Sequence, residues 1–120
     1  MARFSLNRWW RRRRPGPWQV GLTVEEADEL PLAIAHGVAI LVGLRGAPKW
    51  VAFECPCGRG HRIMLNLARS RRPFWSIETA VPLTLWPSVD VTVDNERCHF
   101  VVEYGHINWV REFDLYTSRR

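Results

Sequence analysis

Short apolar runs, separated by glycine, proline and polar residues, make up most of the chain after residue 37. The runs are rich in valine, isoleucine, leucine, phenylalanine and tryptophan, side chains that favour strands. They cover residues 38–43, 49–54, 62–67, 74–78, 83–86, 89–93, 98–103 and 107–111. So many short strands, with little helix between them, predict a mainly β fold, either a small antiparallel sandwich or a partly open barrel.

Two local signals interrupt this β pattern. Thr23 is followed three residues later by Glu26, a capping-box pattern that predicts one short helical turn ending before Pro31. Near the other end, Gly105 and its neighbours predict a tight turn into the last strand, because glycine adopts the positive φ that such turns often need.

Positive charge is concentrated at the start of the chain. Six of the seventeen basic residues, all of them arginines, lie within the first fourteen positions, where there is no acidic residue. The whole chain carries a net charge of +5. Outside the first fourteen positions, however, eleven basic residues face twelve acidic ones, so the rest of the chain is nearly neutral. We therefore divide the chain into a basic arm at residues 1–18, which we expect to be flexible, and a single zinc-binding β domain at residues 19–120. A domain of this length can bury a core without disulfides.

The arm predicts contact with a polyanion such as nucleic acid, or docking on a partner protein. Arg11, Arg12, Arg13 and Arg14 would make these contacts, together with tryptophans that include Trp18. The alternative is a tail with no binding role. The near-neutral remainder of the chain argues against a DNA-reading fold.

The chain contains three cysteines, two of which are separated by a single residue. Such a set does not form a disulfide framework and instead indicates metal binding in a reducing compartment. No apolar run is long enough for a membrane span, and the N-terminus lacks the apolar segment of a signal peptide. We therefore expect a cytoplasmic protein.

Cys55 and Cys57 are the first candidate metal ligands. Pro56 restricts Cys55 to an extended backbone, in which residues two apart project to the same side, so both thiolates can face one ion. Two glycines then let the chain turn and bring His61 back, and Cys98 is the one cysteine left as a fourth ligand. Three sulfurs and one imidazole form a closed, structural zinc site. The alternative is a group of buried thiols beside a solvated histidine.

A second candidate site lies further along the chain. If the strands that contain them pair as antiparallel neighbours, Ser88 and His99 come close enough to hydrogen bond, which is the minimum for a nucleophile and its general base. Asp90, on the same face of a strand as Ser88, or Glu78 would then orient the imidazole ring. The alternative is a turn serine and a structural histidine.

Eight short motifs occur in order along the chain. They are Glu26-x-Asp28-Glu29-Leu30-Pro31, His36-Gly37-Val38, Cys55-Pro56-Cys57-Gly58, Leu65-x-Leu67, Pro73-x-Trp75-Ser76, Thr84-Leu85-x-Pro87-Ser88-Val89, His99-Phe100 and Gly105-x-Ile107-x-Trp109. Over residues 24–110 the chain therefore resembles a small bacterial family, long catalogued only as a domain of unknown function. Its members are encoded beside ubiquitin-like proteins and their activating and conjugating enzymes.

This resemblance implies a zinc-bearing β domain that acts as a peptidase on ubiquitin-like proteins, in a setting of antiphage defence. It assigns Cys55 and Cys57 as metal ligands, Ser88 as the nucleophile and His99 as the general base. The implied partners are the ubiquitin-like protein and its activating and conjugating enzymes.

The chain departs from the family pattern at two places. Arg59 stands where members have a third cysteine, and Asn95 or Glu96 stands where they have a cysteine shortly before the His-Phe pair. Either His61 and Cys98 replace the two missing ligands, or the metal site has been lost.

Cys98 and His99 are neighbours on one predicted strand, so they face opposite sides of the sheet unless a bulge intervenes. We therefore expect Cys98 to face the zinc ion and His99 to face Ser88. Trp86 and Trp109 border a sheet edge at which an extended substrate tail would add as a strand.

Three functions are compatible with the sequence. The first is a hydrolase that cleaves after the C-terminus of a ubiquitin-like protein. The second is a non-catalytic zinc module that recruits such a protein or its conjugation enzymes, and the third is nucleic-acid binding through the arm. A catalytic zinc ion with His99 as a ligand would also need an open coordination position and a general base, for which no carboxylate is obviously placed.

Overall fold

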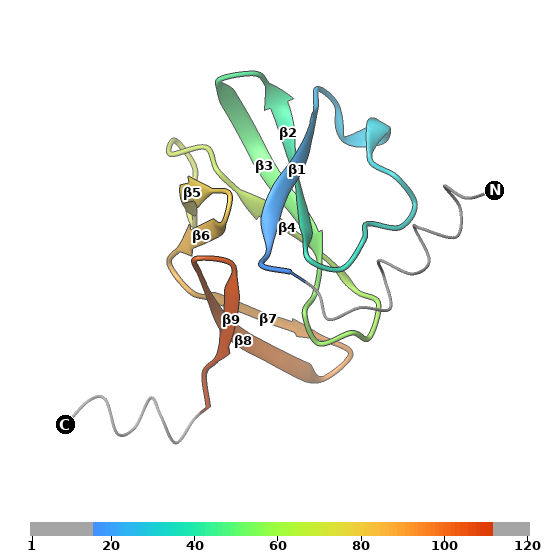
Figure 1. Ribbon diagram of the computed structural model, residues 1–120, viewed down its shortest axis with the longest axis vertical. Coiled ribbons are helices and arrows are strands. Elements are labelled where there is room, and N and C mark those ends of the chain that lie inside the picture. Colours follow the sequence, from blue (N-terminus) through green and yellow to red (C-terminus); the bar gives the residue numbers. More distant parts are fainter. Residues whose placement is uncertain (1–15, 112–120) are drawn as a thin grey trace.

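The computed structural model describes residues 16–111 and confirms a mainly β fold with almost no helix (Figure 1). Within this range, nine strands form three small sheets, and none of the sheets closes into a barrel. The strands are β1 (Gln19–Val24), β2 (Val38–Leu44), β3 (Ala47–Glu54), β4 (Arg62–Asn66), β5 (Ser76–Ala80), β6 (Leu83–Trp86), β7 (Val89–Val93), β8 (Glu96–Glu103) and β9 (His106–Trp109). No helix in the described range has the length and apolar character needed to cross a membrane.

The first sheet holds β1, β2, β3 and β4 in this order, the second is the β5–β6 hairpin, and the third holds β7, β8 and β9. The antiparallel expectation holds for every neighbouring pair except β1 and β2, which run parallel. A parallel pair needs a long connection, and residues 25–37 supply it here. The apolar runs had not predicted β1 at all.

The predicted helical turn is present, but it begins later than expected. It is the 3-10 helix η1 (Ala27–Glu29), and Thr23 belongs to β1 instead of capping the turn. The Glu29 carboxylate accepts the backbone N–H groups of Glu25 and Glu26, each at 2.9 Å. The N-cap position expected at Thr23 therefore falls to Glu26, and Glu29 takes the part in the capping box that was expected of Glu26.

The core lies where the first and third sheets meet. Phe53 of β3 and Phe100 of β8 are almost fully buried, and their ring centroids lie 6.4 Å apart in an edge-to-face contact. Leu83 and Leu85 of β6 are buried in the same cluster, so all three sheets contribute to one core.

Trp18, which the sequence pattern placed in the basic arm, belongs to this core. Its side chain is 5% exposed, and its ring centroid lies 5.8 Å from that of Phe53. Its backbone N–H donates to the carbonyl of Gly105 and its carbonyl accepts the N–H of Leu83, both at 2.8 Å. A Cβ at Gly105, where φ is +82°, would collide with Pro17, so this turn requires glycine. The expected polyanion contact of Trp18 is therefore wrong, because the side chain is buried.

Candidate active site and metal centre

The β7–β8 hairpin positions both candidate sites. Its two-residue loop, Asp94 and Asn95, has φ values of 52° and 66°, the positive values that a type I′ turn needs. The loop sets a register in which Asp90 lies opposite His99. Because side chains alternate across a strand, Cys98 is buried on the core face of β8 and His99 lies on the opposite face.

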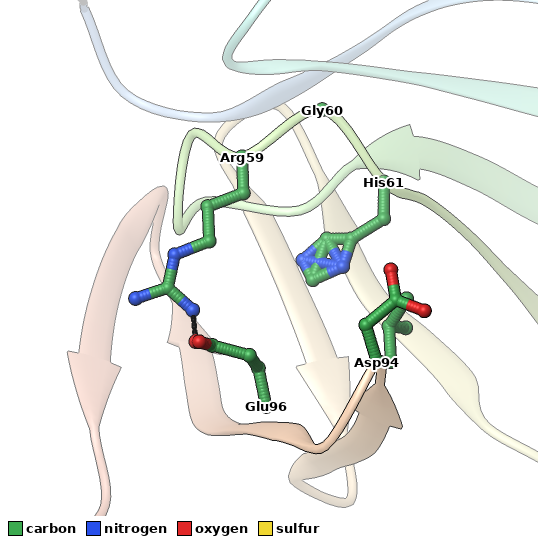
Figure 2. Close-up of a pocket in the computed structure, with 6 residues that line it drawn as sticks. Arg59, Gly60, His61, Asp94 and Glu96 are labelled. Carbon is green, nitrogen blue, oxygen red and sulfur yellow. Dashed lines mark ion pairs between the residues drawn. The ribbon is translucent and has the colours of Figure 1, made fainter.

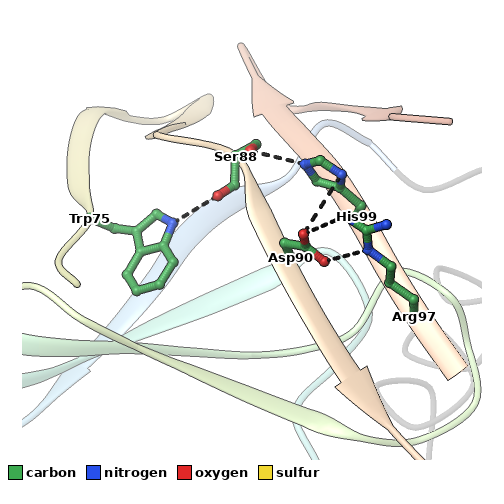
Figure 3. Close-up of polar contacts among 5 residues, drawn as sticks. All are labelled: Trp75, Ser88, Asp90, Arg97 and His99. Atoms are coloured by element: carbon green, nitrogen blue, oxygen red, sulfur yellow. Dashed lines mark hydrogen bonds and ion pairs between the residues drawn. The ribbon is translucent and has the colours of Figure 1, made fainter. Parts of the chain in front are cut away.

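Ser88 and His99 are in contact on the outer face of the third sheet. The Oγ of Ser88 lies 3.1 Å from Nε2 of His99 (Figure 3), which is within hydrogen-bonding distance. The histidine side chain is 13% exposed, and the serine is half-buried. With Nε2 unprotonated, the serine hydroxyl donates to it, as a nucleophile donates to its general base.

Asp90 lies beside the other ring nitrogen. Its Oδ2 is 4.0 Å from Nδ1 of His99, too long for a hydrogen bond but close enough for an electrostatic interaction. Arg97 donates to Oδ1 of Asp90 at 2.9 Å and to Oδ2 at 2.7 Å, and these hydrogen bonds are the main cause of the lowered pKa of Asp90. Glu78, the other residue considered for orienting the ring, instead accepts a hydrogen bond from Ser76 Oγ at 2.6 Å.

Two residues that support this site were not predicted. One is Arg97, for which a signal was available, because a two-residue loop after β7 places it diagonally across from Asp90. The other is Trp75, whose indole N–H donates to the carbonyl oxygen of Ser88 at 3.1 Å (Figure 3). No sequence signal pointed to Trp75, because this contact depends on how the separate sheets pack.

The four predicted metal-ligating residues gather on the core side of β8. Their ligand atoms, the sulfurs of Cys55, Cys57 and Cys98 and a ring nitrogen of His61, all lie within 4.8 Å of one another. The Nε2 of His61 is 2.8 Å from Cys57 Sγ and 3.9 Å from Cys98 Sγ. With bonds of about 2.0–2.3 Å, a tetrahedral zinc ion holds its ligand atoms roughly 3.5–4 Å apart. The cluster is therefore close enough to hold a metal ion, and its donors are compatible with zinc.

The loop between β3 and β4 brings three of these residues together. The N–H of Cys55 donates to the carbonyl of His61 at 2.9 Å, and the N–H of Gly58 donates to the carbonyl of Cys55 at 3.1 Å. Gly58 and Gly60 have φ values of +79° and +91°, which other residues rarely adopt. The loop thus turns back on itself at the two glycines, as the sequence predicted.

Burial and neighbouring groups shift the pKa values of the three thiols in different directions. Burial raises the pKa of Cys55 to about 12 and is the main cause of the raised pKa of Cys98. Burial acts on Cys57 too, but the N–H of Arg59, 3.4 Å from its sulfur, and the neighbouring thiols outweigh it, so the pKa of Cys57 is lowered. Adjacent thiolates repel one another, and a divalent cation allows all of them to ionise.

A pocket of about 380 Å³ opens beside His61 (Figure 2). Arg59 and Glu96 line it and form an ion pair that joins the cysteine loop to the β7–β8 turn. His61 and Cys98, the residues expected to replace the two missing ligands, both stand in the cluster.

The two tryptophans predicted to bind a partner lie at the surface. Trp86 is 65% exposed and Trp109 is 46% exposed. Trp86 precedes Ser88 by two residues, and the ring of Trp109 contacts that of Phe100 at a centroid distance of 5.4 Å. The predicted binding residues of the arm, Arg11, Arg12, Arg13 and Arg14, lie outside the described residues.

Comparison with protein families gives a match over most of the chain. The family described as bacterial ubiquitination-like system serine protease (BubE) matches residues 26–110. This range contains every candidate catalytic and metal-ligating residue named above. No curated protein and no solved structure matches the chain.

Proposed function

Because the chain belongs to the bacterial ubiquitination-like system serine protease family, we propose that it hydrolyses the bond that follows the C-terminal tail of a ubiquitin-like protein. Ser88 is the nucleophile and His99 its general base. The observation that carries this proposal is the 3.1 Å contact between Ser88 Oγ and His99 Nε2 within the matched range. A cytoplasmic setting, together with the activating and conjugating enzymes as further partners, belongs to the same proposal.

In the proposed reaction, Nε2 of His99 accepts the hydroxyl proton of Ser88 while Oγ attacks the carbonyl carbon of the substrate. The imidazolium then donates this proton to the leaving amine, and the tail stays bound to Ser88 as an ester. A water molecule that gives its proton to His99 hydrolyses the ester and releases the tail with a free carboxylate. Asp90 stabilises the imidazolium across 4.0 Å.

We propose that Cys55, Cys57, His61 and Cys98 hold a structural zinc ion. Four protein ligands leave no open coordination position for water or substrate. The ion would instead tie the cysteine loop to β8, the strand on which His99 directly follows Cys98. One zinc per chain is expected in the purified wild type, and less in Cys98→Ser and His61→Ala; unchanged metal content in both variants would refute this ligand set.

The outer edge of β7 is the proposed binding place for the substrate tail. Within residues 16–111, β7 pairs with β8 on one side only, so alternate backbone N–H and C=O groups point away from the sheet. A tail that adds here as an extra strand passes Ser88 at the start of β7. The exposed ring of Trp86, just before Ser88, offers an apolar surface to tail side chains.

A ubiquitin-like protein with a C-terminal peptide extension tests the proposed chemistry. The wild type is expected to release the extension and to react with a fluorophosphonate probe, whereas Ser88→Ala should lose both activities. His99→Ala should lose cleavage by at least about 10³-fold. Ser76→Ala removes a second half-buried serine hydroxyl, one that donates to Glu78 and not to His99, and it should retain both activities.

Equal cleavage rates for the wild type, Ser88→Ala and His99→Ala would refute the assignment. Binding of the ubiquitin-like protein without any cleavage by the wild type would instead support the recruiting module that the sequence also allows.

A further inference from the structure

The connection between β4 and β5, the yellow-green loop in Figure 1, contains three arginines, Arg69, Arg71 and Arg72. The guanidinium carbons of Arg69 and Arg72 lie 5.7 Å and 5.5 Å from the centroid of the Phe74 ring. That of Arg71 lies 5.2 Å from the centroid of the Trp50 ring. All three arginines are exposed. At these distances each guanidinium group interacts with the ring as a cation–π contact, which leaves its N–H groups available to a partner.

The backbone of this connection is held by Asn66, a buried polar residue at the end of β4. Its Nδ2 lies 3.0, 2.9 and 3.0 Å from the carbonyl oxygens of Ala68, Arg71 and Pro73, and its Oδ1 accepts the N–H of Ala68 at 3.0 Å. The loop is therefore ordered before any partner arrives. Pre-ordering of this kind lowers the entropy lost on binding.

The three loop arginines also differ from other arginines in their electrostatic surroundings. Arg59, Arg62 and Arg97 each form an ion pair with a carboxylate. Within residues 16–111, no carboxylate oxygen lies within 4.0 Å of the loop guanidinium groups. This range contains nine basic and ten acidic residues, so the loop concentrates positive charge on a body that is otherwise negative.

The loop leads directly to the candidate nucleophile. The guanidinium groups of Arg69 and Arg72 lie over the ring of Phe74. The next residue, Trp75, donates its indole N–H to the carbonyl of Ser88 (Figure 3). When the tail of a substrate protein reaches Ser88, the folded part of that substrate therefore lies close to the β4–β5 loop.

The kind of partner follows from the groups that the loop presents. Single-stranded nucleic acid binds by stacking its bases on aromatic faces, but here guanidinium groups already lie over the rings of Phe74 and Trp50. The negative body around the loop would repel a longer polyanion. Guanidinium N–H donors form bidentate contacts with carboxylates as well as with phosphates, so carboxylates on a compact protein are the partner that remains.

We propose that Arg69, Arg71 and Arg72 form a docking surface for the folded body of the protein substrate, where they contact a cluster of aspartate and glutamate side chains. This inference rests on the proposed function, which brings the tail of a ubiquitin-like protein to Ser88. The partner is thus a ubiquitin-like protein with an acidic patch near the base of its tail.

The test measures binding in a Ser88→Ala background, in which cleavage cannot intervene. The probe is a fluorescently labelled bacterial ubiquitin-like protein with an intact tail, and Kd is read by anisotropy at low and high salt. Arg69→Glu with Arg72→Glu is expected to weaken binding at least tenfold and to reduce the salt dependence. Arg45→Glu with Lys49→Glu reverses the same number of exposed charges on the β2–β3 hairpin and is expected to change Kd less than threefold.

An unchanged Kd in the Arg69→Glu/Arg72→Glu protein would overturn the proposal, as would an equal loss in the β2–β3 control. Thermal unfolding checks the fold of each variant. If the glutamate pair does not fold, Arg69→Gln with Arg72→Gln replaces it, with a weaker Kd again expected and an unchanged Kd again overturning the proposal.

Two further outcomes separate the alternatives. If the glutamate pair weakened binding of a single-stranded oligonucleotide but not of the ubiquitin-like protein, the assignment of a protein partner would be overturned. Failure of the proposed function shows itself differently, since the wild type would then bind the probe in a charge-dependent way and still not cleave the extended protein.

Discussion

Replacing Asp90 with asparagine removes the negative charge beside His99 while keeping the size of the side chain. The carboxylate lies 4.0 Å from Nδ1 of the ring. At this distance an ion pair is worth about 1 kcal/mol in water and about 4 kcal/mol at an effective dielectric constant of 20. The Asp90 side chain is 42% exposed, and Arg97 already neutralises its charge. The value in water therefore applies.

A loss of about 1 kcal/mol of transition-state stabilisation corresponds to roughly a fivefold change in rate. We therefore expect Asp90→Asn to lower kcat/KM about fivefold. In a triad whose aspartate hydrogen-bonds the histidine, the same replacement costs about 10⁴-fold. The two magnitudes differ enough for a single kinetic measurement to distinguish them.

The assay is steady-state release of the C-terminal extension from a ubiquitin-like protein at neutral pH. Glu103→Gln is the matched control, because it removes one exposed negative charge from β8 at a position away from His99, and it should leave kcat/KM unchanged. A loss near 10⁴-fold in Asp90→Asn would refute the reasoning, because Asp90 would then have to leave Arg97 and hydrogen-bond His99 in the working enzyme. The absence of any loss would refute it equally.

Three further predictions concern stability and positioning. A metal chelator should lower the Tm of the wild type by more than about 10 °C and shift that of Cys98→Ser far less in differential scanning fluorimetry; equal shifts would contradict a role for Cys98. Arg97→Gln removes the bonds that lower the pKa of Asp90. The wild type should be more stable than this variant by less than about 1 kcal/mol, because the pair is exposed. This advantage should be present at pH values above the ordinary aspartate pKa. It should disappear as the pH falls through the lowered pKa, so an advantage that grows toward acid pH in urea unfolding would argue against the pair. Trp75→Phe removes the donor to the Ser88 carbonyl and should cost about 1 kcal/mol of unfolding free energy while lowering kcat more than it raises KM; an unchanged kcat would count against a positioning role.

Strands could be predicted where strong breakers bound an apolar run. The observed bounds of β6 (Leu83–Trp86) and β7 (Val89–Val93) match the prediction residue for residue, because Pro82 precedes the first and Pro87 separates the two. The strand β1 was missed because most of its side chains are exposed. Its formation depends on parallel pairing with a strand that follows only after residues 25–37, and local alternation carries no signal of such pairing.

The geometry of the candidate site was predictable to the extent that it depends on strand alternation. Ser88 and Asp90 share a face, and the strand turns Cys98 and His99 to opposite sides, as expected from their spacing. The contact of Trp75 with Ser88 could not be predicted from the sequence. It joins the segment before β5 to the start of β7, and these strands belong to two separate sheets whose packing against each other depends on the whole core.

The back-to-back placement of Cys98 and His99 makes strand alignment a requirement that both centres share. If β8 slipped by one residue against β7, every side chain would change faces. His99 would then turn toward the cysteines, and Cys98 would turn toward the serine. The loop of Asp94 and Asn95 sets this alignment, so it can accept other residues that tolerate positive φ but not the gain or loss of a single residue. The length of a two-residue turn, more than its composition, is what the thiol cluster and the serine–histidine pair depend on together.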